Sequence, residues 1–220
     1  MEETRTRGGK RVAPRKRRGV RLPPLWILAA LVMVLLLAKG VQVVFFSAPK
    51  DPAVPEWVRQ ELLEVNEYSR PGTELEQVNG IVIHYVGNPG TTAQQNRSYF
   101  AGLAQSGETY ASSHFLVGLD GEIIQCVPLD EIAYCSSQRN VDTISIECCH
   151  PDAEGKFNEA TYQSLLKLTR WLMDTYDLTT EQVIRHYDVT GKECPLYYVR
   201  HPDAWQQFLT DLKNTPSTDT

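Results

Sequence analysis

Basic residues are scarce over most of this 220-residue chain, and it contains no internal repeat. Residues 51–220 hold 11 lysines and arginines against 25 acidic residues, which gives this part a net charge of −14. Such a charge argues against nucleic acid as its partner. With 42% hydrophobic and 22% charged residues, the composition excludes a collagen-like, low-complexity or wholly disordered chain. The length suffices for one good hydrophobic core but not for two large ones.

The basic residues are instead gathered at the N-terminus, ahead of a long apolar segment. Residues 1–24 contain nine basic and two acidic residues, and the 22 residues 25–46 contain one charge, at Lys39. A helix rises about 1.5 Å per residue, so residues 25–46 can cross a hydrocarbon core of roughly 30 Å. We therefore expect a single-pass cell-membrane protein with one transmembrane helix. Residues 1–24 would form a basic cytoplasmic arm, and the chain from residue 51 would be extracellular.

Two other interpretations of the apolar segment remain open. A cleaved signal peptide needs small residues at the cleavage site, and the best candidate site puts the bulky Phe46 at the third position back. A buried helix of a soluble domain would not explain the polybasic arm before it. The pattern favours the membrane anchor over both.

The remaining sequence contains a mixture of strand and helix patterns. Strands are expected at residues 81–86, 113–119, 122–127, 141–149 and 183–184, with an Asp-Gly turn between the second and third. Helices are expected at residues 56–65, from a cap at Thr91 or Thr92 to about Gln105, from a cap at Asn158 to Tyr176, and at residues 202–212. These elements predict a mixed α/β fold, with a central mixed β-sheet flanked by helices and preceded by the one N-terminal transmembrane helix.

Two histidines and a cysteine stand where a metal site could form. His84 lies in the centre of the apolar strand 81–86, His186 follows the strand 183–184, and Cys194 comes eight residues later. Two imidazoles and a thiolate are good zinc ligands, and a catalytic zinc uses three protein ligands and leaves a fourth position for water. The alternative is that His84 is a core histidine whose ring nitrogens are both hydrogen-bonded.

Four segments, taken in order, carry a resemblance to a known family. They are residues 81–89 (IVIHYVGNP), 112–123 (SSHFLVGLDGEI), 143–147 (TISIE) and 185–195 (RHYDVTGKECP). In these segments the sequence resembles the zinc-dependent N-acetylmuramoyl-L-alanine amidases, a type shared by phage endolysins, bacterial wall hydrolases and peptidoglycan recognition proteins. The resemblance spans roughly residues 76–209. It implies a mixed sheet flanked by helices, zinc as the cofactor and peptidoglycan as the partner.

The resemblance also implies a role for individual side chains. It implies His84, His186 and Cys194 as zinc ligands, Glu147 as the acid facing the metal-bound water, and Lys192 as the lysine near the metal. Chemistry supports the last two roles separately, because Glu147 can take the water proton and pass it to the leaving amine, and Lys192 can face the developing oxyanion. From the pattern alone, Glu147 could also be an exposed strand residue and Lys192 a solvated loop lysine.

The sequence departs from the family at one catalytic position. Many members have an assisting tyrosine where this chain has Ser113, so the acid–base chemistry depends more on Glu147. The adjacent His114 could pack in the strand or support a ligand. Asp188 could orient a ligand or cap its loop. His150, three residues after Glu147, could line the substrate cleft, but an exposed histidine is favoured.

Four cysteines remain beside Cys194. Cys126 and Cys135 could close a disulfide loop in an extracellular domain, and all four could also be thiols. Cys148 and Cys149 are strand neighbours that point to opposite faces, so a bond between them would be strained. A nucleophilic role for Cys194 fits less well, because no helix N-terminus is evident to lower its pKa.

The sequence therefore predicts a membrane-anchored, monomeric zinc amidase that cuts the bond between N-acetylmuramic acid and L-alanine of the stem peptide. The predicted divisions are the arm (1–24), the anchor (25–46), a spacer and N-terminal helix (47–75), the zinc amidase catalytic domain (76–212) and a flexible tail (213–220). Two other functions remain. One is a receptor module that binds peptidoglycan without hydrolysis, and the other is a zinc hydrolase of a different amide or peptide bond.

Overall fold

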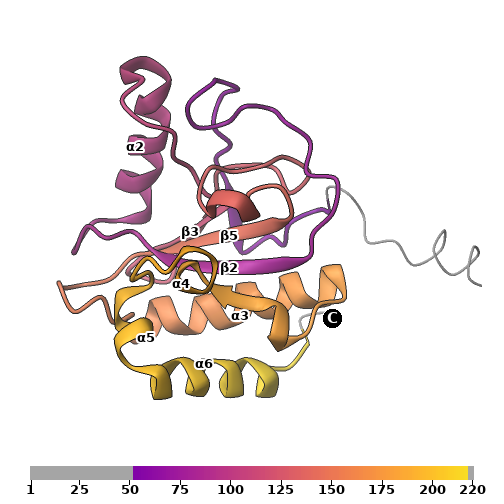
Figure 1. Ribbon diagram of the computed structural model, residues 1–220, viewed down its shortest axis with the longest axis vertical. Helices are drawn as coiled ribbons and strands as arrows, with labels where there is room; N and C mark the ends of the chain where they lie inside the picture. Colours follow the sequence, from indigo (N-terminus) through magenta and orange to yellow (C-terminus); the bar gives the residue numbers. More distant parts are fainter. Residues whose placement is uncertain (1–51, 218–220) are drawn as a thin grey trace, which may run out of the picture. The chain divides into compact units, whose positions relative to one another are not determined.

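A six-stranded β-sheet organises residues 52–217, the part of the chain that the computed structural model describes (Figure 1). Its strands are β1 (Val58–Gln60), β2 (Gly80–Tyr85), β3 (Phe115–Val117), β4 (Ile123–Gln125), β5 (Thr143–Cys148) and β6 (Val183–Arg185). They lie in the order β1-β4-β3-β5-β2-β6. Only β3 and β4 pair antiparallel, across the turn predicted at 120–121. The sheet is therefore mixed, as predicted.

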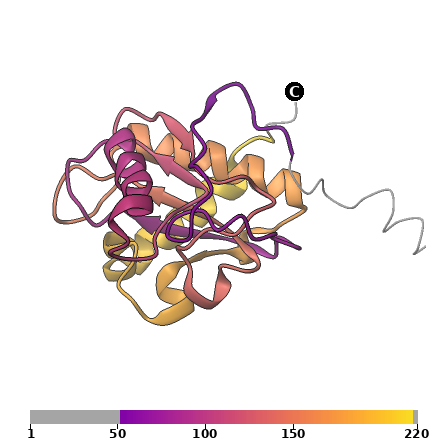
Figure 2. The same cartoon turned by 90° about the horizontal axis from the view of Figure 1, so that it is seen from above.

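Helices cover both faces of this sheet. They are α2 (Ala93–Ser106), α3 (Glu159–Tyr176), α4 (His186–Thr190), α5 (Leu196–Arg200) and α6 (Pro202–Asn214), with 3-10 turns η1 (Ser137–Arg139) and η2 (Thr180–Gln182). Helices α3 and α6 lie on one side of the sheet and α2 on the other, and α2 lies in front when the molecule is seen from above (Figures 1 and 2). Thr92 caps α2 and Asn158 caps α3, which confirms both predicted caps.

Side chains alternate along β2 and β5, so one face of the sheet carries core residues and the other carries candidate site residues. Ile81, Ile83, Ile144 and Ile146 are fully buried in the main core cluster, which also contains apolar side chains of α3 and α6. Residues of the other parity point to the opposite face. His84 belongs to that face, and the parallel register sets it beside Glu147 on β5. The sheet thus separates the main apolar core from the candidate site residues His84 and Glu147.

The segment 56–65, predicted as a helix, forms β1 and extended chain, so that prediction is wrong. Beyond β1 the backbone continues along β4, where the N–H groups of Glu61 and Leu63 donate to carbonyl groups of Gln125 and Cys126 at 3.0 and 2.8 Å. Leu63 is buried whereas Leu62 and Val65 are exposed. Pairing with the free edge of β4 satisfies the backbone hydrogen bonds of this segment. This gain outweighs the preference for a helix that the spacing of its apolar residues indicates.

The predicted loop after His186 is also more structured than expected. It contains the short helices α4 and α5, which flank Cys194. Asp188 stabilises the start of α4, because its carboxylate accepts hydrogen bonds from the Arg185 backbone N–H at 2.9 Å and from the Arg185 guanidinium at 2.7 Å. Of the two roles considered for Asp188, the structure therefore favours the cap.

The predicted basic arm and transmembrane helix lie outside the described residues. Within residues 52–217, no helix combines the length and the apolar character needed to cross a membrane. The last predicted helix is confirmed as α6 and runs to Asn214, two residues beyond its expected end.

Candidate active site

Three metal-ligating side chains from separate parts of the sequence meet at one edge of the sheet. His84 lies near the carboxyl end of β2, His186 begins α4 directly after β6, and Cys194 lies between α4 and α5. One ligand atom from each lies within 4.8 Å of the other two, and all three residues are buried. The rings of His84 and His186 are 4.7 Å apart, and His84 Nδ1 is 3.7 Å from Cys194 Sγ. We call these residues the triad.

Sheet topology and one loop contact bring the triad together. Strands β2 and β6 are parallel neighbours, so their carboxyl ends meet at the same edge. The chain then returns through α4, and the Tyr187 N–H donates to the Cys194 carbonyl group at 2.9 Å. This contact closes the loop that returns Cys194 to His186.

The charge states in the triad fit a bound cation. Burial lowers the pKa of His84 well below its ordinary value, and the charge of His186 adds to this effect. Burial also lowers the pKa of His186. Both imidazoles are therefore held neutral, which is the form that binds metals. Burial raises the pKa of Cys194 to about 12, with Glu147 adding to the rise, so a thiolate there needs a cation beside it.

Glu147 lies beside the triad rather than on an exposed strand face. Its carboxylate, His84 and Cys135 place one ligand atom each within 4.8 Å of one another. Burial raises the pKa of Glu147 to about 8, while a hydrogen bond from Cys135 and the charge of Lys192 oppose that rise. Its Oε2 atom is buried and has no hydrogen-bond partner among the described residues. A buried carboxyl oxygen in this state is available to bind a proton from a reacting group.

Lys192 is exposed and supplies positive charge to this cluster. Its charge lowers the pKa values of His84, His186 and Glu147, and it also lowers that of Cys194. Lys192 therefore lies near enough to the triad for its charge to act on these four groups.

Comparison with known proteins identifies the family. Residues 74–196 match the family model Amidase_2, described as N-acetylmuramoyl-L-alanine amidase. The chain belongs to this family. The match contains all five predicted site residues, namely His84, Glu147, His186, Lys192 and Cys194.

Curated relatives and solved structures agree with this assignment. A probable N-acetylmuramoyl-L-alanine amidase of Bacillus licheniformis is 34% identical over 161 residues, which cover 68% of this chain and 44% of the relative. The amidase CwlL of the same species is 35% identical over 64% of this chain and 42% of its own length. The chain thus spans less than half of each relative. The catalytic domain of XlyA, from Bacillus subtilis, has 27% identity and a TM-score of 0.59, covering 70% of this chain and 98% of that domain.

The position that holds a tyrosine in many family members offers no acid–base group here. Ser113 is fully buried, and its hydroxyl donates to the Phe115 carbonyl group at 2.8 Å. The adjacent His114 is also buried. Its Nε2 lies 2.9 Å from the Glu131 carbonyl group and must carry the proton, so Nδ1 accepts from the Ser145 N–H at 3.0 Å. The His114 ring therefore links β5 to the loop that follows β4.

The prediction that His150 is exposed is wrong. The residue is 1% exposed, and its ring centroid lies 5.0 Å from that of Tyr85. Its Nδ1 donates to the Asp152 carbonyl group at 2.7 Å. The loop after β5 thus packs against Tyr85 at the end of β2, a contact that the sequence pattern could not reveal.

All five cysteines are free, so the disulfide considered between Cys126 and Cys135 is not present. Cys148 and Cys149 do point to opposite faces, one into the main core cluster and the other into the cluster beneath α2. Cys135 instead lies in the site, with its Sγ atom 3.6 Å from Glu147 Oε1. Sequence reasoning missed this position, because nothing in the pattern around Cys135 links it to β5.

Ser136 is a second site residue that the sequence did not indicate. Its hydroxyl lies 3.1 Å from His84 Nε2 and is buried. Asn140 fixes this turn, since its Oδ1 accepts from the N–H groups of Cys135 and Ser136 at 3.1 and 2.6 Å. A hydrogen bond from His84 Nε2 to Ser136 leaves Nδ1 as the free nitrogen, facing Cys194.

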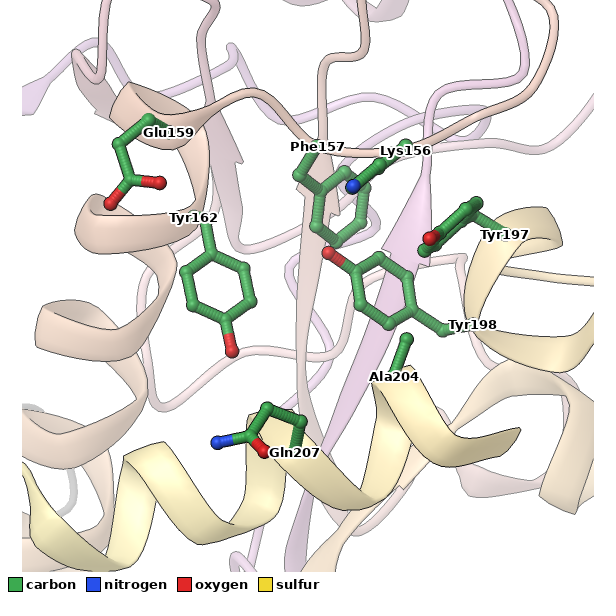
Figure 3. A pocket seen from close by; sticks show the side chains of 8 residues that line it. All are labelled: Lys156, Phe157, Glu159, Tyr162, Tyr197, Tyr198, Ala204 and Gln207. Carbon is green, nitrogen blue, oxygen red and sulfur yellow. The ribbon is translucent and has the colours of Figure 1, made fainter. Parts of the chain in front are cut away.

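A separate pocket of about 230 Å³ lies on the side of the sheet that α3 and α6 cover (Figure 3). It is lined by Lys156, Phe157, Glu159, Tyr162, Tyr197, Tyr198, Ala204 and Gln207. None of these is a predicted site residue, and His84 and Glu147 point to the opposite face. This pocket is therefore distinct from the triad.

Replacing Ser136 by Ala should weaken metal binding at the triad by about 10- to 100-fold, because the His84 ring loses the hydrogen bond that orients it. The measurement is a zinc competition titration against a chromophoric chelator. Ser98→Ala is the matched control, since Ser98 is exposed on α2 and donates only to the Gln94 carbonyl group. Equal zinc affinities for the two variants would show that Ser136 does not position His84.

Proposed function

We propose that this chain is a zinc-dependent amidase that hydrolyses peptidoglycan between the lactyl group of N-acetylmuramic acid and L-alanine of the stem peptide. Membership of the N-acetylmuramoyl-L-alanine amidase family supports the reaction class. The observation that carries the proposal is the buried, unpaired carboxyl oxygen of Glu147 beside the triad. This arrangement combines a metal site with a group that can transfer protons.

His84, His186 and Cys194 would hold the zinc ion. Two neutral imidazoles and one thiol that needs a compensating cation suit zinc, and three protein ligands leave a position for water or substrate. When bound, zinc supplies an activated water and polarises the scissile carbonyl group. All other chemistry has to come from side chains of the protein.

Glu147 is the group placed to move the proton. Its unpaired Oε2 can accept a proton from the attacking water and then deliver it to the departing L-alanine nitrogen. Positive charge nearby favours its carboxylate form, and the raised pKa makes that carboxylate a stronger base. Lys192 would stabilise the negative charge that develops on the carbonyl oxygen.

We further propose that residues 25–46 anchor the chain in the cell membrane with residues 1–24 in the cytoplasm. The length of the apolar segment and the nine basic residues before it support this topology. The −14 charge of residues 51–220 makes net attraction to an anionic wall a poor source of affinity. The anchor would provide proximity to the wall, and the site would provide recognition.

Digestion of purified peptidoglycan by residues 51–220 should release peptides with a free N-terminal L-alanine, which mass spectrometry identifies. Glu147→Gln should lower the rate by at least about 100-fold while zinc content stays unchanged, because the proton carrier is lost. Glu181→Gln is the matched control, since Glu181 is exposed on η2, before β6 begins. New reducing sugar ends, or an active Glu147→Gln variant, would contradict the proposal.

The anchor is tested by fractionating cells that express the full chain or residues 51–220. The full chain should sediment with membranes, resist extraction by high salt and dissolve in detergent, because an apolar helix rather than charge holds it. Protease added to intact protoplasts should remove its C-terminal domain. Recovery of the full chain in the soluble fraction would refute the anchor.

A further inference from the structure

A second set of metal-ligating side chains adjoins the triad. His84, Cys135 and Glu147 offer an imidazole nitrogen, a sulfur and a carboxylate oxygen, and these three atoms lie within 4.8 Å of one another. They come from β2, from the turn before η1 and from β5. The turn is fixed by Asn140, as described above, so Cys135 is held in place next to Glu147.

One atom of this set lacks a partner. Glu147 Oε1 has Cys135 Sγ at 3.6 Å, whereas Oε2 is buried without a hydrogen bond from any described residue. Leaving a buried carboxyl oxygen unpaired costs free energy, so such an atom indicates a missing partner. A cation bound beside the carboxylate would supply a partner for this oxygen.

The electrostatics of the set also favour a cation. Burial, together with the charge of Glu147, raises the pKa of Cys135 well above its ordinary value. The negative charge of Glu147 thus disfavours a thiolate at Cys135, and a bound cation would relieve this repulsion. Thiolate sulfur and imidazole nitrogen prefer zinc and cadmium to magnesium or calcium, which prefer oxygen ligands.

We propose that His84, Cys135 and Glu147 form an alternative position for a thiophilic divalent cation such as zinc or cadmium. On binding, the Cys135 thiol releases its proton to solvent and the sulfur bonds to the metal, with no change of oxidation state. His84 is common to both positions, so a cation held here removes a ligand from the triad. The cation also binds the Glu147 carboxylate, which can then no longer accept a proton. If the proposed function holds, this cation inhibits hydrolysis.

Cadmium titration of the full chain in a Cys194→Ser background tests the position directly. Cadmium bound by sulfur gives an ultraviolet thiolate-to-metal absorption band. We expect this band to persist in Cys194→Ser, and Cys135→Ser added to that background should abolish it and weaken cadmium binding by at least about tenfold. Cys126→Ala is the matched control, because Cys126 is buried in the cluster beneath α2 and should leave the band intact.

Two outcomes would overturn the alternative position. Absence of the band in folded Cys194→Ser would mean that no second sulfur ligand exists, and a band that survives Cys135→Ser would assign it to another thiol. Circular dichroism checks folding. If Cys194→Ser does not fold, the His186→Ala background replaces it, where Cys135→Ser should reduce cadmium affinity by the same factor and an unchanged affinity would refute the position.

Zinc inhibition separates this inference from the proposed function. Excess zinc should inhibit peptidoglycan hydrolysis by the wild type, and Cys135→Ser should need at least about tenfold more zinc for equal inhibition. If the wild type shows no hydrolysis at all, the proposed function fails, while the cadmium titration still decides whether the position exists. Equal zinc sensitivity of an active wild type and Cys135→Ser would refute the inhibitory role.

Discussion

The parallel pairing of β2 with β5 on one side and β6 on the other is the constraint on which the site depends. It sets His84 beside Glu147 in register and brings the end of β6, and hence His186, to the same edge. The same alternation sends the isoleucines of β2 and β5 into the main core. Because side chains alternate with a period of two, a slip of one residue would bury the imidazole among apolar groups and expose the isoleucines. Core packing and site geometry therefore stabilise one register.

Burial also controls the chemistry of the site, because it disfavours the charged forms of His84, His186, Cys194 and Glu147. It holds both imidazoles neutral and makes the thiol of Cys194 and the carboxyl of Glu147 reluctant to ionise. A divalent cation offsets the free-energy cost of ionising the buried Cys194 thiol and Glu147 carboxyl, because it attracts both anions, and the neutral imidazoles can bind it directly. Lys192 is exposed and offsets only part of the cost. These buried side chains therefore form a cluster that suits a metal ion, and Cys135 lies next to it.

The sequence could predict the parts of this structure that local pattern controls. Thr92 and Asn158 cap helices as expected, and His84 sits in a doubly buried strand. The helix predicted at residues 56–65 is absent because this segment pairs with the edge of β4, which lies far away in the sequence. Helices α4 and α5 have five residues each, too few to leave a periodic signal. Cys135 and Ser136 reach the site only because a turn folds across the ends of β2 and β5.

Zinc held by His84, His186 and Cys194 would have one sulfur and two imidazole ligands. X-ray absorption spectroscopy of the protein with one equivalent of zinc measures this coordination shell. We expect a single sulfur at about 2.3 Å and two imidazole nitrogens at about 2.0–2.1 Å. A shell with no sulfur, with two or more sulfurs, or with a single imidazole would contradict zinc binding by these three residues.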